Sequence, residues 1–212
     1  IYNKLIFNRL LPFVSPLLRK NQNGFHAGRS TLSQILALRR IIEEMSHCNR
    51  DVALVFIDFS KAFHSVDRDT MFKILALYGI PAAIIDAIKI LYSDTSATVL
   101  SPDGETEAFD ICAGILQGDT LAPFLFIIVL DYVLRMSVDK IHDNGLEIHP
   151  RMSSRNPAVY LTDTDFADDI ALISGSLFNA QNLLSSLEAA AKCVGLHFNE
   201  SKTEYINKTN DI

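Results

Sequence analysis

Asp51-Val52-Ala53-Leu54-Val55-Phe56-Ile57-Asp58 is a short apolar run, rich in β-branched side chains and bounded by two acids. An unbroken apolar run of this length is typical of a strand that is buried on both faces of a sheet. The pattern therefore predicts a buried strand at this point of the chain. Its last residue, Asp58, places a carboxylate at the end of that strand.

A second pair of acids lies much later, in Phe166-Ala167-Asp168-Asp169. Polar and apolar side chains alternate between Tyr160 and Ile173. This alternation predicts strands at 157–166 and 170–174 that are joined by a tight turn. The two acids should therefore lie at the tip of a hairpin.

Adjacent carboxylates repel one another, so such a pair is costly without a counter-cation. Carboxylate oxygens are the ligands that Mg²⁺ prefers, and a pair of ions about 3.5 to 4 Å apart can stabilise both oxygens of an in-line phosphoryl displacement. Asp58, at the end of another strand, can supply a third carboxylate. The alternative is that Asp-Asp merely suits a turn.

Helices and further hairpins are predicted around these two segments. The second helix should open with a capping box at Thr31 and Gln34, and the first should break at Pro12 and Pro16. The patterns indicate helices at 1–11, 31–48, 68–78, 81–92, 121–138 and 177–194, a hairpin of 95–101 with 106–112, and a last strand pair near 196–206. The expected core face of the second helix is Leu32, Ile35, Leu36, Leu38, Ile41, Ile42 and Met45. Because helices and hairpins do not alternate strictly, the fold class should be α+β.

The composition is that of a globular protein. Of 212 residues, 49% are hydrophobic and 21% charged, which excludes a disordered or collagen-like chain. The cysteines at 48, 112 and 193 lie too far apart for a cysteine zinc site and favour a reducing compartment. The most apolar run, Leu121 to Leu130, is interrupted by Pro123 and is about half the length of a membrane span. It predicts a buried helix and no membrane partner.

Charge is distributed unevenly along the chain. The net charge is −6, yet residues 1–50 hold eight basic side chains against two acids, and residues 51–212 hold 11 against 23. A basic segment joined to an acidic one suits a protein that grips phosphates at one place and holds cations at another. Ordinary surface variation is the open alternative.

Five blocks of sequence carry a family resemblance. They are Asn23-Gly24-Phe25 through Arg29-Ser30-Thr31, Phe56-Ile57-Asp58-Phe59-Ser60-Lys61-Ala62-Phe63 with Ser65-Val66-Asp67, Gly114-Ile115-Leu116-Gln117-Gly118-Asp119 with Leu121-Ala122-Pro123, Phe166-Ala167-Asp168-Asp169, and Gly195-Leu196-His197-Phe198-Asn199 with Ser201-Lys202-Thr203. In this order they resemble the reverse transcriptases of non-LTR retrotransposons. His64 departs from the pattern, because an acid is usual before Ser-Val-Asp.

The resemblance implies a right-hand polymerase fold, in which an antiparallel palm sheet has helices behind it and the fingers are helices and hairpins. Residues 1–50 would be partial fingers, 51–64 the part of the palm that carries the first metal carboxylate, 65–113 a fingers insertion with the hairpin, and 114–212 the rest of the palm. No stretch is left for a thumb. The chain also starts at Ile1 without a methionine. We therefore expect the central piece of a longer polyprotein, with thumb and endonuclease segments elsewhere.

The resemblance also implies a reaction and its metal ligands. Asp58 and Asp168 would bridge two Mg²⁺ or Mn²⁺ ions, Asp169 would be a less direct third member, and the backbone carbonyl of Phe59 would contact one ion. The 3′ hydroxyl of a DNA primer would attack the α-phosphate of a dNTP, with RNA as the template.

Further residues would bind the nucleotide. Phe63 would lie beneath the sugar and exclude a ribose 2′ hydroxyl, and Gln117 with Gly118 would form the turn that contacts the nucleotide and the template. Arg29 would bind the triphosphate, and Lys202 would protonate the leaving pyrophosphate. From the residues alone, a core position is the favoured interpretation of Phe63, and Arg29 and Lys202 could be solvated surface charges.

Two other functions remain open at this stage. A catalytically inactive RNA- or template-binding remnant could keep the fold, although a binding module has no use for clustered acids. A metal-dependent hydrolase is the other, but there are no His ligands near the acids, and neither G-x-S-x-G nor a P-loop occurs.

Overall fold

The computed structural model of the protein describes residues 1–25, 28–102, 104–116, 118 and 120–208. Helices and strands are mixed along the chain, as the α+β prediction requires. The helices are α1 (Tyr2–Val14), α2 (Thr31–His47), α3 (Ala62–Ser65), α4 (Arg68–Leu77), α5 (Ala82–Tyr92), α6 (Ala122–Met136) and α7 (Leu177–Lys192), with 3₁₀ turns at Ser15–Leu17 and Val138–Asn144. The strands are β1 (Val52–Ile57), β2 (Ser96–Ala97), β3 (Leu100–Ser101), β4 (Gly104–Glu105), β5 (Phe109–Asp110), β6 (Leu146–His149), β7 (Val159–Leu161), β8 (Asp163–Phe166), β9 (Asp169–Ser174) and β10 (Glu204–Lys208).

The main sheet has the strand order β10-β1-β9-β8, and every neighbouring pair is antiparallel. Ile57 of β1 lies opposite Ile170 of β9, and Phe166 of β8 lies opposite Asp169. The predicted strand 51–58 is therefore an inner strand, and its buried pattern on both faces is confirmed.

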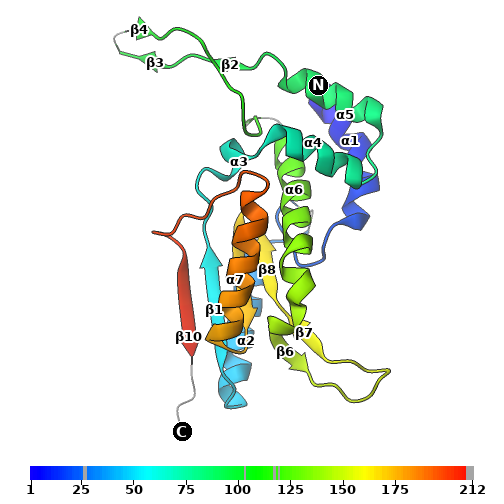
Figure 1. Ribbon diagram of the computed structural model, residues 1–212, viewed down its shortest axis with the longest axis vertical. Helices are drawn as coiled ribbons and strands as arrows, with labels where there is room; N and C mark the ends of the chain where they lie inside the picture. Colours follow the sequence, from blue (N-terminus) through cyan, green and yellow to red (C-terminus); the bar gives the residue numbers. More distant parts are fainter. Residues whose placement is uncertain (26–27, 103, 117, 119, 209–212) are drawn as a thin grey trace.

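The two faces of the sheet are covered differently. Side chains alternate between faces along a strand, so Val55 and Leu172 join the large core with α6 and α7, whereas Leu54 and Ile173 join a smaller cluster with Met45 of α2. Figure 1 shows α6 and α7 on one side of the sheet and α2 on the other.

Helix α6 is the predicted buried helix. Eleven of its fifteen residues are buried, which is the pattern of a helix that is apolar all round. Among the described residues, no helix is long and apolar enough to cross a membrane.

Several helix predictions need correction. Helix α1 continues past Pro12 and ends at Val14. Because Pro12 lies in the last turn, its missing N–H removes one backbone hydrogen bond near the end of the helix and leaves the earlier turns intact. Helix α2 is capped by Ser30, whose hydroxyl accepts from the Ser33 amide, so Thr31 is its first residue and not its cap.

The predicted core face of α2 is only half right. Met45 is buried, and Leu38, Ile41 and Ile42 pack against the smaller cluster. The first turns are exposed, with Leu32, Ile35 and Leu36 at 73%, 63% and 65%. The apolar stripe extends beyond the part of α2 that packs on the sheet.

The strand predictions also need correction. The strand at 157–166 is divided at Thr162, because β7 pairs with β6, which the sequence did not indicate, while β8 pairs with β9. The last strand pair is wrong: β10 pairs with β1, and the segment before it makes only an isolated bridge between Phe198 and Phe59. The hairpin near 95–112 is present as two short pairs, β2 with β5 and β3 with β4.

Helix α4 offers a test of the local structure. The Asp67 carboxylate accepts from the Thr70 amide at 2.7 Å, and this bond lowers the Asp67 pKa below 3.8. Replacing a cap of this kind by alanine costs about 1 kcal/mol. We therefore expect Asp67→Ala to lower the free energy of unfolding by about that amount at neutral pH, measured by urea denaturation.

The pH dependence has a definite sign. Because the Asp67 pKa is lower in the folded state, the extra stability of wild type over Asp67→Ala is fully present above pH 3.8. It is lost as the pH falls through the pKa of Asp67 in the folded protein. Asp67→Asn, which keeps an acceptor, should stay close to wild type. Equal stability of Asp67→Ala and wild type at neutral pH would contradict the capping role.

Candidate active site

The three acids singled out in the sequence meet at one end of the sheet. The antiparallel register that pairs Ile57 with Ile170 brings Asp58 opposite Asp169 one step further along. Asp168 is in the two-residue turn between β8 and β9. The pKa of Asp169 is raised by partial burial and by the like charges of Asp168 and Asp58. Asp169 therefore lies close enough to both other carboxylates to feel their charge.

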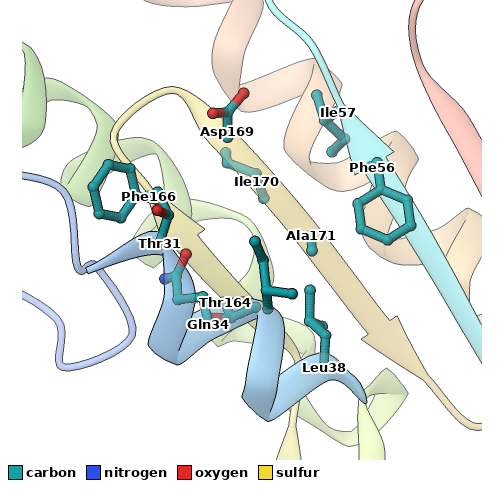
Figure 2. Close-up of a pocket in the computed structure, with 11 residues that line it drawn as sticks. Thr31, Gln34, Leu38, Phe56, Ile57, Thr164, Phe166, Asp169, Ile170 and Ala171 are labelled. Atoms are coloured by element: carbon teal, nitrogen blue, oxygen red, sulfur yellow. The ribbon is translucent and has the colours of Figure 1, made fainter. Parts of the chain in front are cut away.

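A groove that includes Asp169 in its lining lies on the α2 side of the sheet. Its volume is about 280 Å³, and its lining is largely apolar, with Phe56, Ala171 and Leu38 among its walls. Figure 2 shows Asp169 at the end of β9, close to the Ile57 end of β1, with α2 lying across β8. The acid end of the sheet thus opens onto a hollow and not onto the packed core.

The backbone of Phe59 is oriented toward the acids. Its ring is buried against Phe198, with ring centroids 5.4 Å apart. The amide of Ser60 donates to the His197 carbonyl, and the amide of Asn199 donates to the backbone carbonyl of Asp58, so these two bonds flank the bridge between Phe59 and Phe198. In such an antiparallel pair, the amide and carbonyl of Phe59 itself point away from the Phe198 segment. The Phe59 carbonyl therefore faces the β9 side of β1, where the acids lie.

Phe63 has features of both predicted roles. Its ring stacks on the fully buried Phe126 with centroids 4.5 Å apart, yet the residue is only partly buried. One face of the ring is thus fixed by the core.

The Gly114 turn packs on the segment that carries Phe63. The amide of Ile115 donates to the Phe63 carbonyl at 2.6 Å. Further along, Gly118 is exposed with a φ of +106°, and a Cβ there would meet nothing within 4 Å. The glycine is thus required by its backbone conformation and leaves open space around it. Gln117 lies outside the described residues.

The two predicted basic residues occupy different settings. Lys202 Nζ lies 3.9 Å from Asp58 Oδ2. Arg29 is exposed, and its Nη1 donates to the carbonyls of Lys20 and Gln22 at 2.9 and 2.6 Å. Lys202 therefore lies beside Asp58, whereas Arg29 forms hydrogen bonds within its own loop.

The donor set suits a hard cation. Asp58 and Asp168 offer carboxylate oxygens and Phe59 offers a carbonyl, which are the ligand types of Mg²⁺. Within the described part of the chain, no group of three His, Cys, Asp or Glu side chains is arranged to hold a metal. A set of two carboxylates and one carbonyl needs only two such side chains, and Mg²⁺ usually takes its remaining ligands from water and phosphate.

Comparison with known proteins decides the family. The model of the family described as "Reverse transcriptase (RNA-dependent DNA polymerase)" matches residues 1–212. The chain belongs to the reverse transcriptase family.

Its relatives are retrotransposon proteins. The chain is 31% identical over 154 residues, or 72% of its length, to the Retrovirus-related Pol polyprotein from type-2 retrotransposable element R2DM of Drosophila melanogaster, of which it covers 13%. It is 27% identical over 84% of its length to the Pol polyprotein from the type-1 element R2 of Popillia japonica, of which it covers 28%. The chain is thus a reverse transcriptase domain of the non-LTR retrotransposon type and spans less than a third of these relatives.

Solved structures show the same fold. Telomerase from Candida tropicalis in complex with a telomeric RNA fragment matches 97% of this chain and 32% of its own, with a TM-score of 0.64 and 15% identity. Telomerase from Candida albicans matches 99% of this chain and 34% of its own, also with a TM-score of 0.64 and with 10% identity. These similarities confirm the α+β fold over nearly the whole reverse transcriptase domain.

The sequence did not indicate the buried ion pairs beneath the acidic hairpin. The Arg19 guanidinium lies in the interior of the reverse transcriptase domain and donates to both Asp163 oxygens at 2.7 and 2.9 Å. It also reaches Asp165 at 3.2 Å and Asp139 at 2.9 Å. Its backbone amide donates to Asp131 at 2.6 Å. The helix-breaking segment after α1 is therefore anchored directly to β8.

The charges in this cluster are strongly coupled. Burial alone would lower the pKa of Arg19, but the bond to Asp163 and the charges of the acids raise it. Burial would likewise raise the pKa of Asp163, and the Arg19 bond and charge hold it below its usual value. Asp165 is different, because burial and the neighbouring Asp163 raise its pKa well above normal. The ion pair between Arg19 and Asp163 is therefore the main charge interaction in this buried cluster.

We expect Arg19→Met to be strongly destabilising. It would leave the buried Asp163 without its counter-ion, and breaking a buried pair from one side costs about 3 to 5 kcal/mol. Urea denaturation measures the loss. The matched control is Arg39→Met, which removes an ion pair with Glu43 on the exposed side of α2 and should cost less than about 1 kcal/mol. Equal effects of the two variants would contradict the anchoring role.

Proposed function

We propose that this chain is the catalytic core of an RNA-directed DNA polymerase that transfers a nucleotide from a dNTP to a primer 3′ hydroxyl on an RNA template. Membership of the reverse transcriptase family supports the reaction class. The single observation that carries the proposal is the sheet register that sets Asp58 beside the Asp168–Asp169 hairpin. Acids gathered at the rim of a groove suit phosphoryl transfer better than binding alone.

Asp58, Asp168 and the Phe59 carbonyl would hold the Mg²⁺ or Mn²⁺ ions. When bound, such ions neutralise triphosphate charge and lower the pKa of a primer hydroxyl. The chain itself supplies positioning. Asp169 would lie beside these ligands, since partial burial and the like charges of Asp168 and Asp58 raise its pKa.

The remaining residues would handle the nucleotide. Lys202, already beside Asp58, would donate a proton to the leaving pyrophosphate. Arg29 would contact the triphosphate through guanidinium nitrogens other than Nη1, which holds the loop. Phe63, fixed from behind by Phe126, would block a 2′ hydroxyl. Gly118, with its turn partner Gln117, would let the nucleotide and template approach the backbone closely.

The subdomains would follow the sequence expectation. Residues 51–64 and 114–212 would form the palm, since they supply the main sheet and its covering helices α6 and α7. Residues 1–50 and 65–113 would form the fingers. In support of this division, the hairpin of β2 to β5 projects from one end of the molecule, away from the sheet (Figure 1).

We expect Asp168→Asn to reduce dNTP incorporation by about 10³-fold or more, because metal ions contribute several kcal/mol to such reactions and each 1.36 kcal/mol is tenfold in rate. The measurement is primer extension on an RNA template with Mg²⁺, in the protein that carries this chain. Asp86→Asn is the matched control, since Asp86 is an exposed acid on α5. Full activity of Asp168→Asn would reject the assignment. Template binding without incorporation by the wild type would favour the inactive binding remnant.

Phe63→Ala tests the sugar selectivity. Removing a ring that excludes a hydroxyl should lower the preference for dNTP over ribonucleotide by roughly 10- to 100-fold. Competing incorporation of the two nucleotides measures this ratio. Phe72→Ala, which removes a partly buried ring packed against Tyr92, controls for a general loss of stability. An unchanged ratio would return Phe63 to a purely structural role.

A further inference from the structure

Gln22 is buried, with 2% of its surface exposed, and its side chain is bonded to the turn that carries Asp168. Its Oε1 accepts from the Ala167 amide at 2.9 Å and from the Gly24 amide at 2.7 Å. Its Nε2 donates to the Ala167 carbonyl at 3.2 Å. One side chain thus holds both backbone polar groups of the residue immediately before Asp168.

The loop around Gln22 lies along β8 like a short added strand. The Asp165 amide donates to the Asn21 carbonyl at 3.2 Å, and the Asn23 amide donates to the Asp165 carbonyl at 2.8 Å. Gly24 then touches the turn so closely that a Cβ would lie 2.2 Å from the Ala167 nitrogen. The loop therefore follows the shape of the turn without a gap.

The turn needs such support because its backbone is strained. Ala167 has a φ of +56°, a left-handed conformation that is strained for a residue with a Cβ. Strained residues persist only where the surroundings over-determine them. The direction in which Asp168 leaves the turn depends on the backbone of Ala167. Contacts that fix Ala167 therefore fix the Asp168 carboxylate as well.

The same residue is also connected to Arg29. The Gln22 carbonyl accepts from Arg29 Nη1 at 2.6 Å, while its side chain holds Ala167. A continuous set of bonds therefore runs from Arg29 through Gln22 to the turn before Asp168.

We propose that Gln22 is a positioning residue, which holds Asp168 in the orientation that binds the catalytic metal and links that orientation to the Arg29 loop. This inference rests on the proposed polymerase function. Gln22 acts through Ala167 and touches no reacting group. Groups that orient a metal ligand in this way change metal affinity or activity by about 10- to 100-fold when they are lost.

The test compares Gln22→Met with Gln34→Met. Methionine matches the length of glutamine and removes its hydrogen bonds. Gln34 is a suitable control because its amide donates to the Asp165 carbonyl, so it holds the same hairpin without touching the turn. Two quantities are measured in the protein that carries this chain: the Mg²⁺ concentration for half-maximal primer extension, and Mn²⁺ binding followed by electron paramagnetic resonance.

We expect Gln22→Met to raise the Mg²⁺ requirement and weaken Mn²⁺ binding by about 10-fold or more. Its kcat should fall more than its KM for dNTP changes. Gln34→Met should leave the metal dependence at the wild-type value. Gly24→Ala, whose added Cβ would press on the Ala167 backbone, should reproduce the Gln22→Met effect. Wild-type metal binding in both Gln22→Met and Gly24→Ala would overturn the inference.

Failure of the proposed function looks different. A wild-type protein that binds Mn²⁺ but does not extend a primer would reject polymerase activity, while the comparison of metal binding still decides the role of Gln22. If neither variant folds, amide hydrogen exchange in the wild type decides. Protection of the Ala167 amide equal to that of its strand neighbours supports the role of Gln22 as a positioning residue, and rapid exchange of this amide contradicts it.

Discussion

The register between β1 and β9 is the constraint on which the site depends. Because Ile57 lies opposite Ile170, the acid that follows β1 and the acid that begins β9 reach the same end of the sheet. A shift of one residue would turn Asp58 toward the opposite face, where the large core packs. The apolar side chains of both strands forbid this shift, since Val55 and Leu172 must face α6 and α7. Burial of the core thus sets the position of the proposed catalytic acids.

Acids are used in two opposite ways on the same hairpin. Asp163 is buried and held by Arg19, whereas Asp168 and Asp169 keep contact with solvent and have no such partner among the described residues. The Arg19–Asp163 ion pair holds β8 against the segment after α1. Asp168 and Asp169 leave negative charge concentrated at the groove, which is where a cation would be stabilised most. The Gln22 amide lies between these two regions and fixes the turn with neutral bonds that add no charge there.

Local patterns predicted the parts of the fold that depend on local sequence. The apolar run of β1, the helix predicted at 68–78 and the acid pair at a turn could all be inferred from periodicity and turn chemistry. The long-range contacts of Arg19 and Gln22 could not, because these partners lie more than 110 residues away along the chain and neither residue stands in a recognisable pattern. The exposed start of α2 was missed for a related reason: periodicity reveals an apolar stripe but not where its covering element ends.

The most direct measurement is an experimental structure of the protein with an RNA template, a chain-terminated DNA primer, a dNTP and Mg²⁺. We expect one ion about 2.0 to 2.1 Å from oxygens of both Asp58 and Asp168, and a second ion about 3.5 to 4 Å from the first. Carboxylate oxygens of these two residues that stay more than about 8 Å apart could not share ions with this spacing. That result, or ions held by other residues, would contradict the central claim.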